Sequence, residues 1–151
     1  MTAAFETISQ DTIQPDYGLQ LDRIVSMNRV FKLPTNTTPT DQGTLRLYEF
    51  ESVVHEELSE LKQARQSPEG EDRFVAVADL LADVLVYTLS ESVRWGLPIV
   101  DIFNAVMDSQ ESKLVDGKPV MSADGSKFIK GPNYQPPEPK IRAIIKQAMQ
   151  M

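Results

Sequence analysis

Two acidic segments of the chain carry side chains that are able to bind a divalent cation. They are His55-Glu56-Glu57-Leu58-Ser59-Glu60 and, further along, Asp79-Leu80-Leu81-Ala82-Asp83. Each lies in a stretch whose apolar residues recur with helical periodicity. At ~100° per residue, Glu57 falls inside the apolar stripe of its helix, Glu60 lies at the margin and Glu56 points further round. The stripe consists of Leu47, Phe50, Val53, Val54, Leu58 and Leu61.

The second acidic segment belongs to a stretch, Phe74 to Leu97, that is apolar almost all round. A narrow polar strip interrupts it, formed by Asp79, Asp83, Ser90 and Arg94. A helix that is apolar on most sides is normally buried, and an isolated buried charge is very costly. Two helices that present inward carboxylates to each other therefore predict a divalent-metal site.

Two other interpretations of the acidic residues are open. Acidic residues at helical spacing usually form a solvated face, which suits Glu56 and its polar neighbours Ser59 and Lys62. It suits Glu57, Asp79 and Asp83 less well, because their neighbours on the helical wheel are aliphatic. Buried ion pairs with Arg94 or Lys62 are the second alternative. The pattern favours the metal site over both.

The composition limits the chemistry further. The chain has 151 residues, 41% of them hydrophobic, which is enough for the core of a single domain spanning residues 1–151. It has no cysteine, so disulfides and thiolate sites are excluded. Its one histidine, His55, argues against a zinc site or a histidine-based proton relay.

The charge is unevenly distributed. The formal net charge of −7 argues against a nucleic-acid-binding surface. From Lys113 onward, however, seven Lys or Arg residues face three acids. An acidic body with a basic tail suits a ligand that is both metal-bound and polyanionic. A tail that merely neutralises the body explains the charge equally well.

The expected location is the cytoplasm. Residues Met1–Gln14 have neither the basic region nor the apolar run of a signal peptide. No stretch approaches ~20 uninterrupted apolar residues, so we expect no membrane span.

The periodicity predicts four main helices after a loosely ordered lead-in at residues 1–17. Leu33-Pro34 ends the first helix, because a residue before proline avoids the helical region. Gly96 is predicted to cap the third helix, with Pro98 just beyond. The expected bounds are Leu19–Phe31, Thr44–Gln66, Glu71–Trp95 and Ile99–Lys113.

The basic tail, residues 114–151, is predicted to be mostly irregular. A hairpin is expected between the turn dipeptides Asp116-Gly117 and Asp124-Gly125. The segment Lys130 to Pro137 is too proline-rich for a helix or a central strand. A short helix is expected at Lys140–Gln150.

These residues resemble the MazG-like nucleoside triphosphate pyrophosphohydrolases, which are related to dimeric dUTPases and phosphoribosyl-ATP pyrophosphohydrolase. The resemblance covers roughly residues 20–138, and its tail motifs are similar to those of a subgroup that includes phage proteins. The motifs are Glu56-Glu57-x-x-Glu60, Ala82-Asp83-Val84-Leu85, Trp95-Gly96-Leu97-Pro98, Ser109-Gln110-Glu111-Ser112-Lys113, Asp116-Gly117-Lys118 and Lys130-Gly131-Pro132-Asn133-Tyr134.

The resemblance implies an all-α, four-helix MazG-like bundle that assembles as a homodimer or homotetramer. It also implies that Glu57, Glu60 and Asp83 bind Mg²⁺ or Mn²⁺, with Glu56 helping to hold a metal or activate water. The family usually has Glu-x-x-Asp in its second motif, whereas the position three before Asp83 is Leu80. Asp79 could take this role, because residues i and i+4 share a helix face.

The resemblance further implies a set of substrate-binding residues. Lys113, with Lys127, Lys130 and Tyr134, would contact phosphates. Gln110 stands where the family usually has Asn, and it too can donate to phosphate or sugar.

Asn28 matches a position that is associated with base recognition in relatives. A surface Asn facing a loop is the alternative interpretation of this residue.

The implied reaction is hydrolysis of a nucleoside triphosphate to the monophosphate and pyrophosphate. The expected substrate is dGTP or GTP, with dUTP or dCTP as the alternative. A different class of protein also fits the charges: a non-catalytic acidic helical module that binds Ca²⁺, or binds a partner protein through its basic tail.

Overall fold

The computed structural model of the protein describes residues 21–151. Within this range the chain is mostly helical, which confirms the expected all-α class. The predicted lead-in at residues 1–17 lies outside the described residues. In chain order the elements are α1 (Leu21–Val30), α2 (Thr44–Ser59), α3 (Leu61–Gln66), α4 (Glu71–Trp95), α5 (Ile99–Glu111), β1 (Val120–Met121), β2 (Phe128–Ile129) and α6 (Glu138–Ala148).

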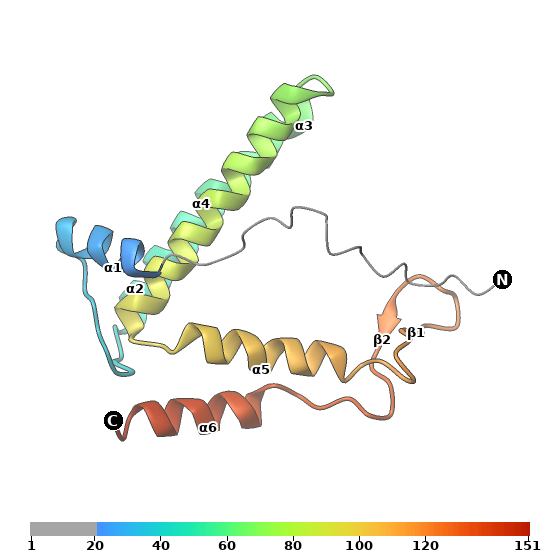
Figure 1. Cartoon of the computed structure of the whole chain (residues 1–151). Coiled ribbons are helices and arrows are strands. Elements are labelled where there is room, and N and C mark those ends of the chain that lie inside the picture. Colours follow the sequence, from blue (N-terminus) through green and yellow to red (C-terminus); the bar gives the residue numbers. More distant parts are fainter. Residues whose placement is uncertain (1–20) are drawn as a thin grey trace, which may run out of the picture.

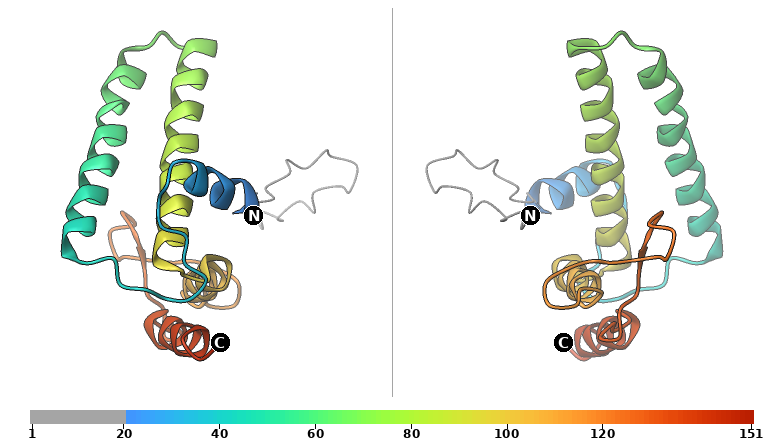
Figure 2. Two further views of the ribbon diagram at one scale, coloured as in Figure 1. Left: turned by 90° about the vertical axis from the view of Figure 1, so that its left-hand side faces the viewer. Right: turned by 90° about the vertical axis from the view of Figure 1, so that its right-hand side faces the viewer.

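A long helical hairpin and a second pair of helices make up the architecture. In the helical hairpin, α2 and α3 run antiparallel to α4, and α1 packs near its base (Figures 1 and 2). At that base the chain turns into α5, and α6 runs back along α5 (Figure 1). The helices α4 and α5 diverge from the turn between them, so one chain alone does not close the expected four-helix bundle.

Gly96 ends α4, as the sequence predicts. It adopts a left-handed conformation with φ of 63°, and its N–H donates to the carbonyl of Val93. The loop after α1 covers the same helix end, where the N–H of Asn36 also donates to the Val93 carbonyl at 3.0 Å. A Cβ atom at position 96 would overlap the carbonyl group of Thr38 in that loop. The corner between α4 and α5 therefore requires glycine.

An ion-pair network joins α2 to α4 near the base of the helical hairpin. The Nε atom of Arg46 donates to both carboxylate oxygens of Glu91, each at 3.0 Å. The indole N–H of Trp95 donates to the same carboxylate at 2.7 Å. Glu91 is only 8% exposed. Since buried carboxylates need such partners, the network fixes how α2 and α4 are aligned.

The apolar core of one chain is small. Among the described residues, the buried apolar side chains are those of Ile24, Ala64, Leu80, Leu89 and Ala105. Other apolar side chains of α4 face solvent, including Phe74 at 74% exposure and Leu81 at 63%. The expectation that this helix is buried therefore fails within residues 21–151 of a single chain, where the main packing partners of α4 are α1, α2 and α3.

The second predicted helix also differs from expectation, because it is interrupted at Glu60. This residue separates α2 from α3. Helix α4 has its predicted bounds, and α5 ends two residues earlier than predicted.

The tail contains a short hairpin and a terminal helix, as predicted, at shifted positions. Its β-hairpin pairs Val120 with Ile129 and Met121 with Phe128, so the turn contains Asp124-Gly125. The predicted bounds of the hairpin, between the two turn dipeptides, are therefore wrong, because the second dipeptide forms its turn. Asp116-Gly117 forms a separate small turn between Val115 and Lys118. The terminal helix α6 begins two residues earlier than expected, after Pro137. No helix among residues 21–151 is long and apolar enough to cross a membrane.

Candidate metal site and basic cluster

Three carboxylates from the two predicted acidic segments meet between α2 and α4. Glu57, Glu60 and Asp83 each offer one oxygen, and these oxygens lie within 4.8 Å of one another. Glu57 is in the last turn of α2, Glu60 is at the break that follows, and Asp83 is midway along α4. We call these three residues the acidic cluster.

The carboxylate of Glu57 is destabilised by burial and by the negative charges around it. Its Oε2 atom is buried and has no hydrogen-bond partner within residues 21–151. Burial raises the pKa of this carboxyl above its usual value, and repulsion from Glu60 and Asp83 raises it further. Glu56 and Asp79 add smaller repulsive contributions to the same pKa. A bound cation would remove both costs, because it would supply the missing partner and the opposite charge.

The donor set fits a hard divalent cation. Carboxylate oxygens are the ligands that Mg²⁺ prefers in proteins, and Mn²⁺ accepts the same set. The alternative of buried ion pairs is not realised in the described part of the chain. Arg94 lies near Glu91 instead. No ion pair of Lys62 is recorded within residues 21–151.

Two predicted ligands lie outside the acidic cluster. Asp79 and Glu56 are exposed, although both are close enough to raise the pKa of Glu57. Leu80, where the family usually has an acid, is buried in the core with 5% exposure. Asp79 is therefore on a different side of α4 from the position that it was expected to replace.

Four of the predicted substrate-binding residues gather at the other end of α5. The Nζ atom of Lys113 donates to the side-chain carbonyl of Gln110 at 2.6 Å. Nearby, the Nζ atom of Lys130 lies 4.4 Å from the centre of the Tyr134 ring. We call Gln110, Lys113, Lys130 and Tyr134 the basic cluster.

Serine hydroxyls hold the proline-rich segment against the end of α5. The hydroxyl of Ser109 donates to the carbonyl of Gln135 at 2.7 Å, and the N–H of Gln135 donates to the hydroxyl of Ser112 at 2.9 Å. A Cβ atom on Gly131 would be only 2.9 Å from the carbonyl oxygen of Lys113. This close approach brings Lys130 and Lys113 to one place although they are far apart in the sequence.

Lys127 is separate from the basic cluster, in the exposed turn of the β-hairpin. Its N–H donates to the hydroxyl of Ser122 at 3.2 Å. In the same turn, hydrogen bonds from Ser122 and Ser126 lower the pKa of Asp124 to about 2. These bonds stiffen the turn that carries Lys127.

Asn28 is fully buried where α1 meets α4, with 0% exposure. Its amide donates to the carbonyl of Ser90 at 3.2 Å and accepts from the Ser90 hydroxyl at 2.7 Å. The alternative of a surface Asn is therefore wrong. In this arrangement the side chain joins two helices and offers no exposed atom to a ligand.

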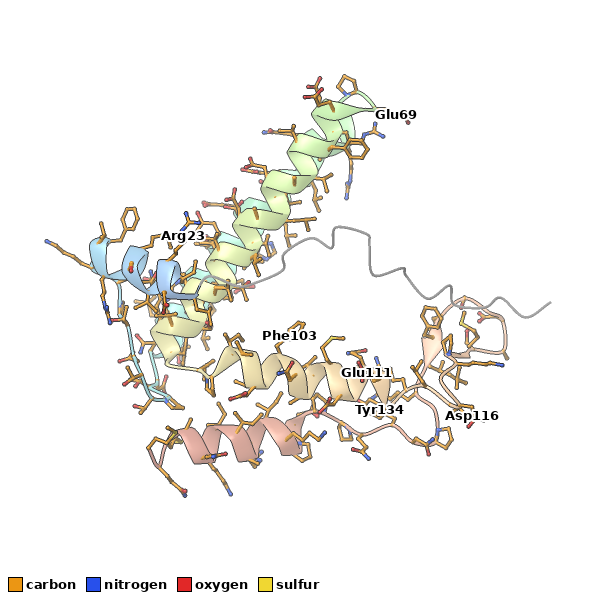
Figure 3. The ribbon with its side chains drawn as sticks, in the orientation of Figure 1. Arg23, Glu69, Phe103, Glu111, Asp116 and Tyr134 are labelled. Carbon is orange, nitrogen blue, oxygen red and sulfur yellow. The ribbon has the colours of Figure 1, made fainter. Side chains whose placement is uncertain are left out.

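The two clusters are on different arms of the chain. The acidic cluster belongs to the helical hairpin, whose tip is marked by Glu69 in Figure 3. The basic cluster lies at the far end of α5, marked by Glu111 and Tyr134 in Figure 3. Since α4 and α5 diverge, one chain does not bring the basic tail over the acidic residues.

Sequence patterns missed the residues that align the helices. Arg46, Glu91 and Trp95 are not part of either acidic segment, yet their buried network fixes α2 against α4. The only available signal was the placement of a charged residue, Glu91, in the apolar second half of α4.

Comparisons with known proteins give a structural match. No protein-family model matches the chain. Curated proteins give no match either. Among solved structures, the chain is similar to a crystal structure of a candidate NTP pyrophosphohydrolase from Exiguobacterium sp. 255-15, with a TM-score of 0.51 and 22% sequence identity. The similarity covers 87% of this chain and 97% of that one, so the two proteins share an overall all-α fold.

Proposed function

We propose that this protein hydrolyses a nucleoside triphosphate to the monophosphate and pyrophosphate, using Mg²⁺ or Mn²⁺. One observation carries the proposal: carboxylate oxygens of Glu57, Glu60 and Asp83 lie within 4.8 Å of one another, and Oε2 of Glu57 is buried without a hydrogen-bond partner within residues 21–151. The description of the similar structure as a candidate NTP pyrophosphohydrolase supports the same reaction class.

Glu57, Glu60 and Asp83 would hold the cation in this proposal. A bound divalent ion supplies Lewis acidity and lowers the pKa of a water molecule, which promotes attack on phosphorus. Glu56 is next to Glu57 and exposed, so its carboxylate is free to accept the proton of an attacking water. Asp79, on the exposed side of α4, is proposed as a further metal ligand.

The basic cluster would bind the phosphates, with Lys113 and Lys130 neutralising the leaving pyrophosphate and Lys127 contributing from the β-hairpin. Charged hydrogen bonds of this kind are among the strongest in proteins. Since the two clusters are on separate arms, we propose that the basic cluster of one chain serves the acidic cluster of another. A homodimer or homotetramer would also cover the exposed apolar face of α4.

The proposed substrate is dGTP or GTP, with dUTP or dCTP as the alternative. This choice rests on the resemblance of the tail motifs to those of phage MazG-like enzymes. Asn28 is buried against Ser90, so its proposed role is to hold α1 against α4 rather than to contact the base directly.

A turnover assay with two variants tests this function. The full chain is incubated with each common NTP and dNTP in Mg²⁺ or Mn²⁺, and monophosphate and pyrophosphate are separated by ion-exchange chromatography. We expect Glu57→Gln to lower turnover by about 100-fold or more, because it removes a ligand of the cation that would stabilise the developing charge, and loss of a charge-stabilising group costs on this order. Glu51→Gln is the control, because Glu51 is an exposed acid on the same helix outside the acidic cluster.

The outcomes separate the classes of protein. If the wild-type chain hydrolyses none of the nucleotides, the proposed pyrophosphohydrolase activity is rejected. If Glu57→Gln hydrolyses them as fast as the wild type does, the proposed role of the acidic cluster in that activity is rejected. Binding of a metal without turnover would instead favour the non-catalytic acidic module.

A further inference from the structure

The helix that carries the first acidic segment is broken at one of the proposed ligands. Helix α2 ends at Ser59, α3 begins at Leu61, and Glu60 lies between them. Breaks in a helix have identifiable causes, such as proline, glycine or a side chain that competes for the backbone hydrogen bonds. Neither proline nor glycine occurs between Thr44 and Gln66.

The backbone hydrogen bonds show a local tightening. The N–H of Glu60 donates to the carbonyl of Glu57 at 3.0 Å, which is an i to i−3 bond. A regular α-helix would direct this N–H to the carbonyl of Glu56. That carbonyl instead accepts the hydroxyl of Ser59 at 2.6 Å. The serine hydroxyl thus replaces the backbone donor that the Glu56 carbonyl has lost.

The tightening changes the direction in which Glu60 points. In an α-helix, residues three apart differ by ~60° around the axis, whereas in a 3₁₀ turn they lie one above the other. The tightened turn therefore brings the direction of Glu60 closer to that of Glu57, and both carboxylates offer oxygens near Asp83 of α4. All three contribute oxygens to the acidic cluster.

We propose that Ser59 is a positioning residue of the metal site: its hydroxyl stabilises the break that aims Glu60 at the cation held with Glu57 and Asp83. The inference rests on the proposed function, since it assigns the cation to the acidic cluster. Serine hydroxyls that bond the preceding turn are known to bend helices. Alanine at position 59 would let Glu60 return to the regular i to i−4 bond, and its carboxylate would then rotate away.

Binding of Mn²⁺ alone, without nucleotide, tests the inference by isothermal titration calorimetry. We expect Ser59→Ala to weaken Mn²⁺ binding by about tenfold, as losses of residues that orient metal ligands usually do. Ser59→Thr should bind like the wild type, because its hydroxyl can bond the same carbonyl. Ser67→Ala is the matched control, since it removes a serine hydroxyl that bonds Gln63 at 3.0 Å in the same helical hairpin.

A double-mutant cycle shows whether Ser59 acts through Glu60. In a Glu60→Gln background, Ser59→Ala should cause little further loss of Mn²⁺ affinity, because the ligand that it positions is already altered. Equal Mn²⁺ affinity of Ser59→Ala and wild type, or additive losses in the cycle, would overturn the role of Ser59. Absence of Mn²⁺ binding by the wild type would overturn the proposed metal site, a different result that the titration distinguishes.

Discussion

At the scale of single residues, the acidic cluster brings like charges together, and no ion pair recorded within residues 21–151 neutralises them. Burial and repulsion raise the pKa of the Glu57 carboxyl. Between its usual and its raised pKa, the folded chain binds more protons at this group than the unfolded chain does. The free energy of unfolding of the metal-free protein therefore falls as pH rises through that interval. A bound cation would offset this loss, which links the stability of the protein to its proposed ligand.

Asp79 gives a prediction at this scale. It is exposed and outside the three converging carboxylates, yet near enough to raise the pKa of Glu57. If it contributes to cation binding from its own side of α4, Asp79→Asn should lower turnover in Mg²⁺, with partial recovery in the geometrically more permissive Mn²⁺. Steady-state kinetics with both metals provide the measurement. Equal kcat and KM in wild type and variant would leave Asp79 with no role in the site.

At the scale of elements, the corner between α4 and α5 determines where the two arms of the chain go. It depends on a left-handed Gly96 and on the loop after α1, which supplies an N–H to the carbonyl of Val93. Free carbonyls at a helix end need such partners. The same loop leaves no room for a side chain at position 96.

We therefore expect Gly96→Ala to lower the free energy of unfolding by more than about 1 kcal/mol, because alanine at positive φ is strained. The overlap with Thr38 adds to this cost. Urea unfolding followed by circular dichroism measures the change. Gly125→Ala is the control, with φ of 68° but nothing within 4 Å of the added Cβ. If both variants lose the same stability, the contact with Thr38 has no energetic consequence.

At the scale of the whole molecule, helix α4 leaves several large apolar side chains exposed within residues 21–151. Phe74, Leu81 and Leu85 on α4 are all exposed, and contiguous apolar patches mark interaction surfaces. The acidic cluster and the basic cluster carry opposite charge on separate arms. Both features support the assembly proposed above, in which the basic cluster of one chain serves the acidic cluster of another.

Complementation tests this arrangement. A Glu57→Gln chain and a Lys113→Ala, Lys130→Ala chain should each have low activity alone. Hybrids obtained by co-expression should recover part of it, because one pairing in the mixture combines an intact acidic cluster with an intact basic cluster. Hybrids of a Glu57→Gln chain with an Asp83→Asn chain should recover no activity, since both substitutions alter the acidic cluster and no pairing contains an intact one. Failure of the first hybrid, once its formation is verified by mass spectrometry, would contradict a shared site.

Much of the helical structure follows from the sequence alone. Helix α4 has its predicted bounds, and Gly96 caps it as expected, because periodicity and capping are local properties of a segment. The convergence of the two acidic segments also agrees with their positions inside otherwise apolar helices. The amino acid pattern thus limits which carboxylates are available for a site.

The tertiary structure decided which of these carboxylates meet. Packing of α2 against α4, fixed by Arg46 and Glu91, brings Glu57 and Asp83 together and leaves Asp79 outside. The break at Glu60 was not predictable, because no proline or glycine marks it, and the hydrogen bond from Ser59 to which we attribute it is visible only in the structure. The burial of Asn28 likewise depends on Ser90, 62 residues away. Periodicity describes only neighbours within a segment, whereas contacts between segments depend on how whole helices pack.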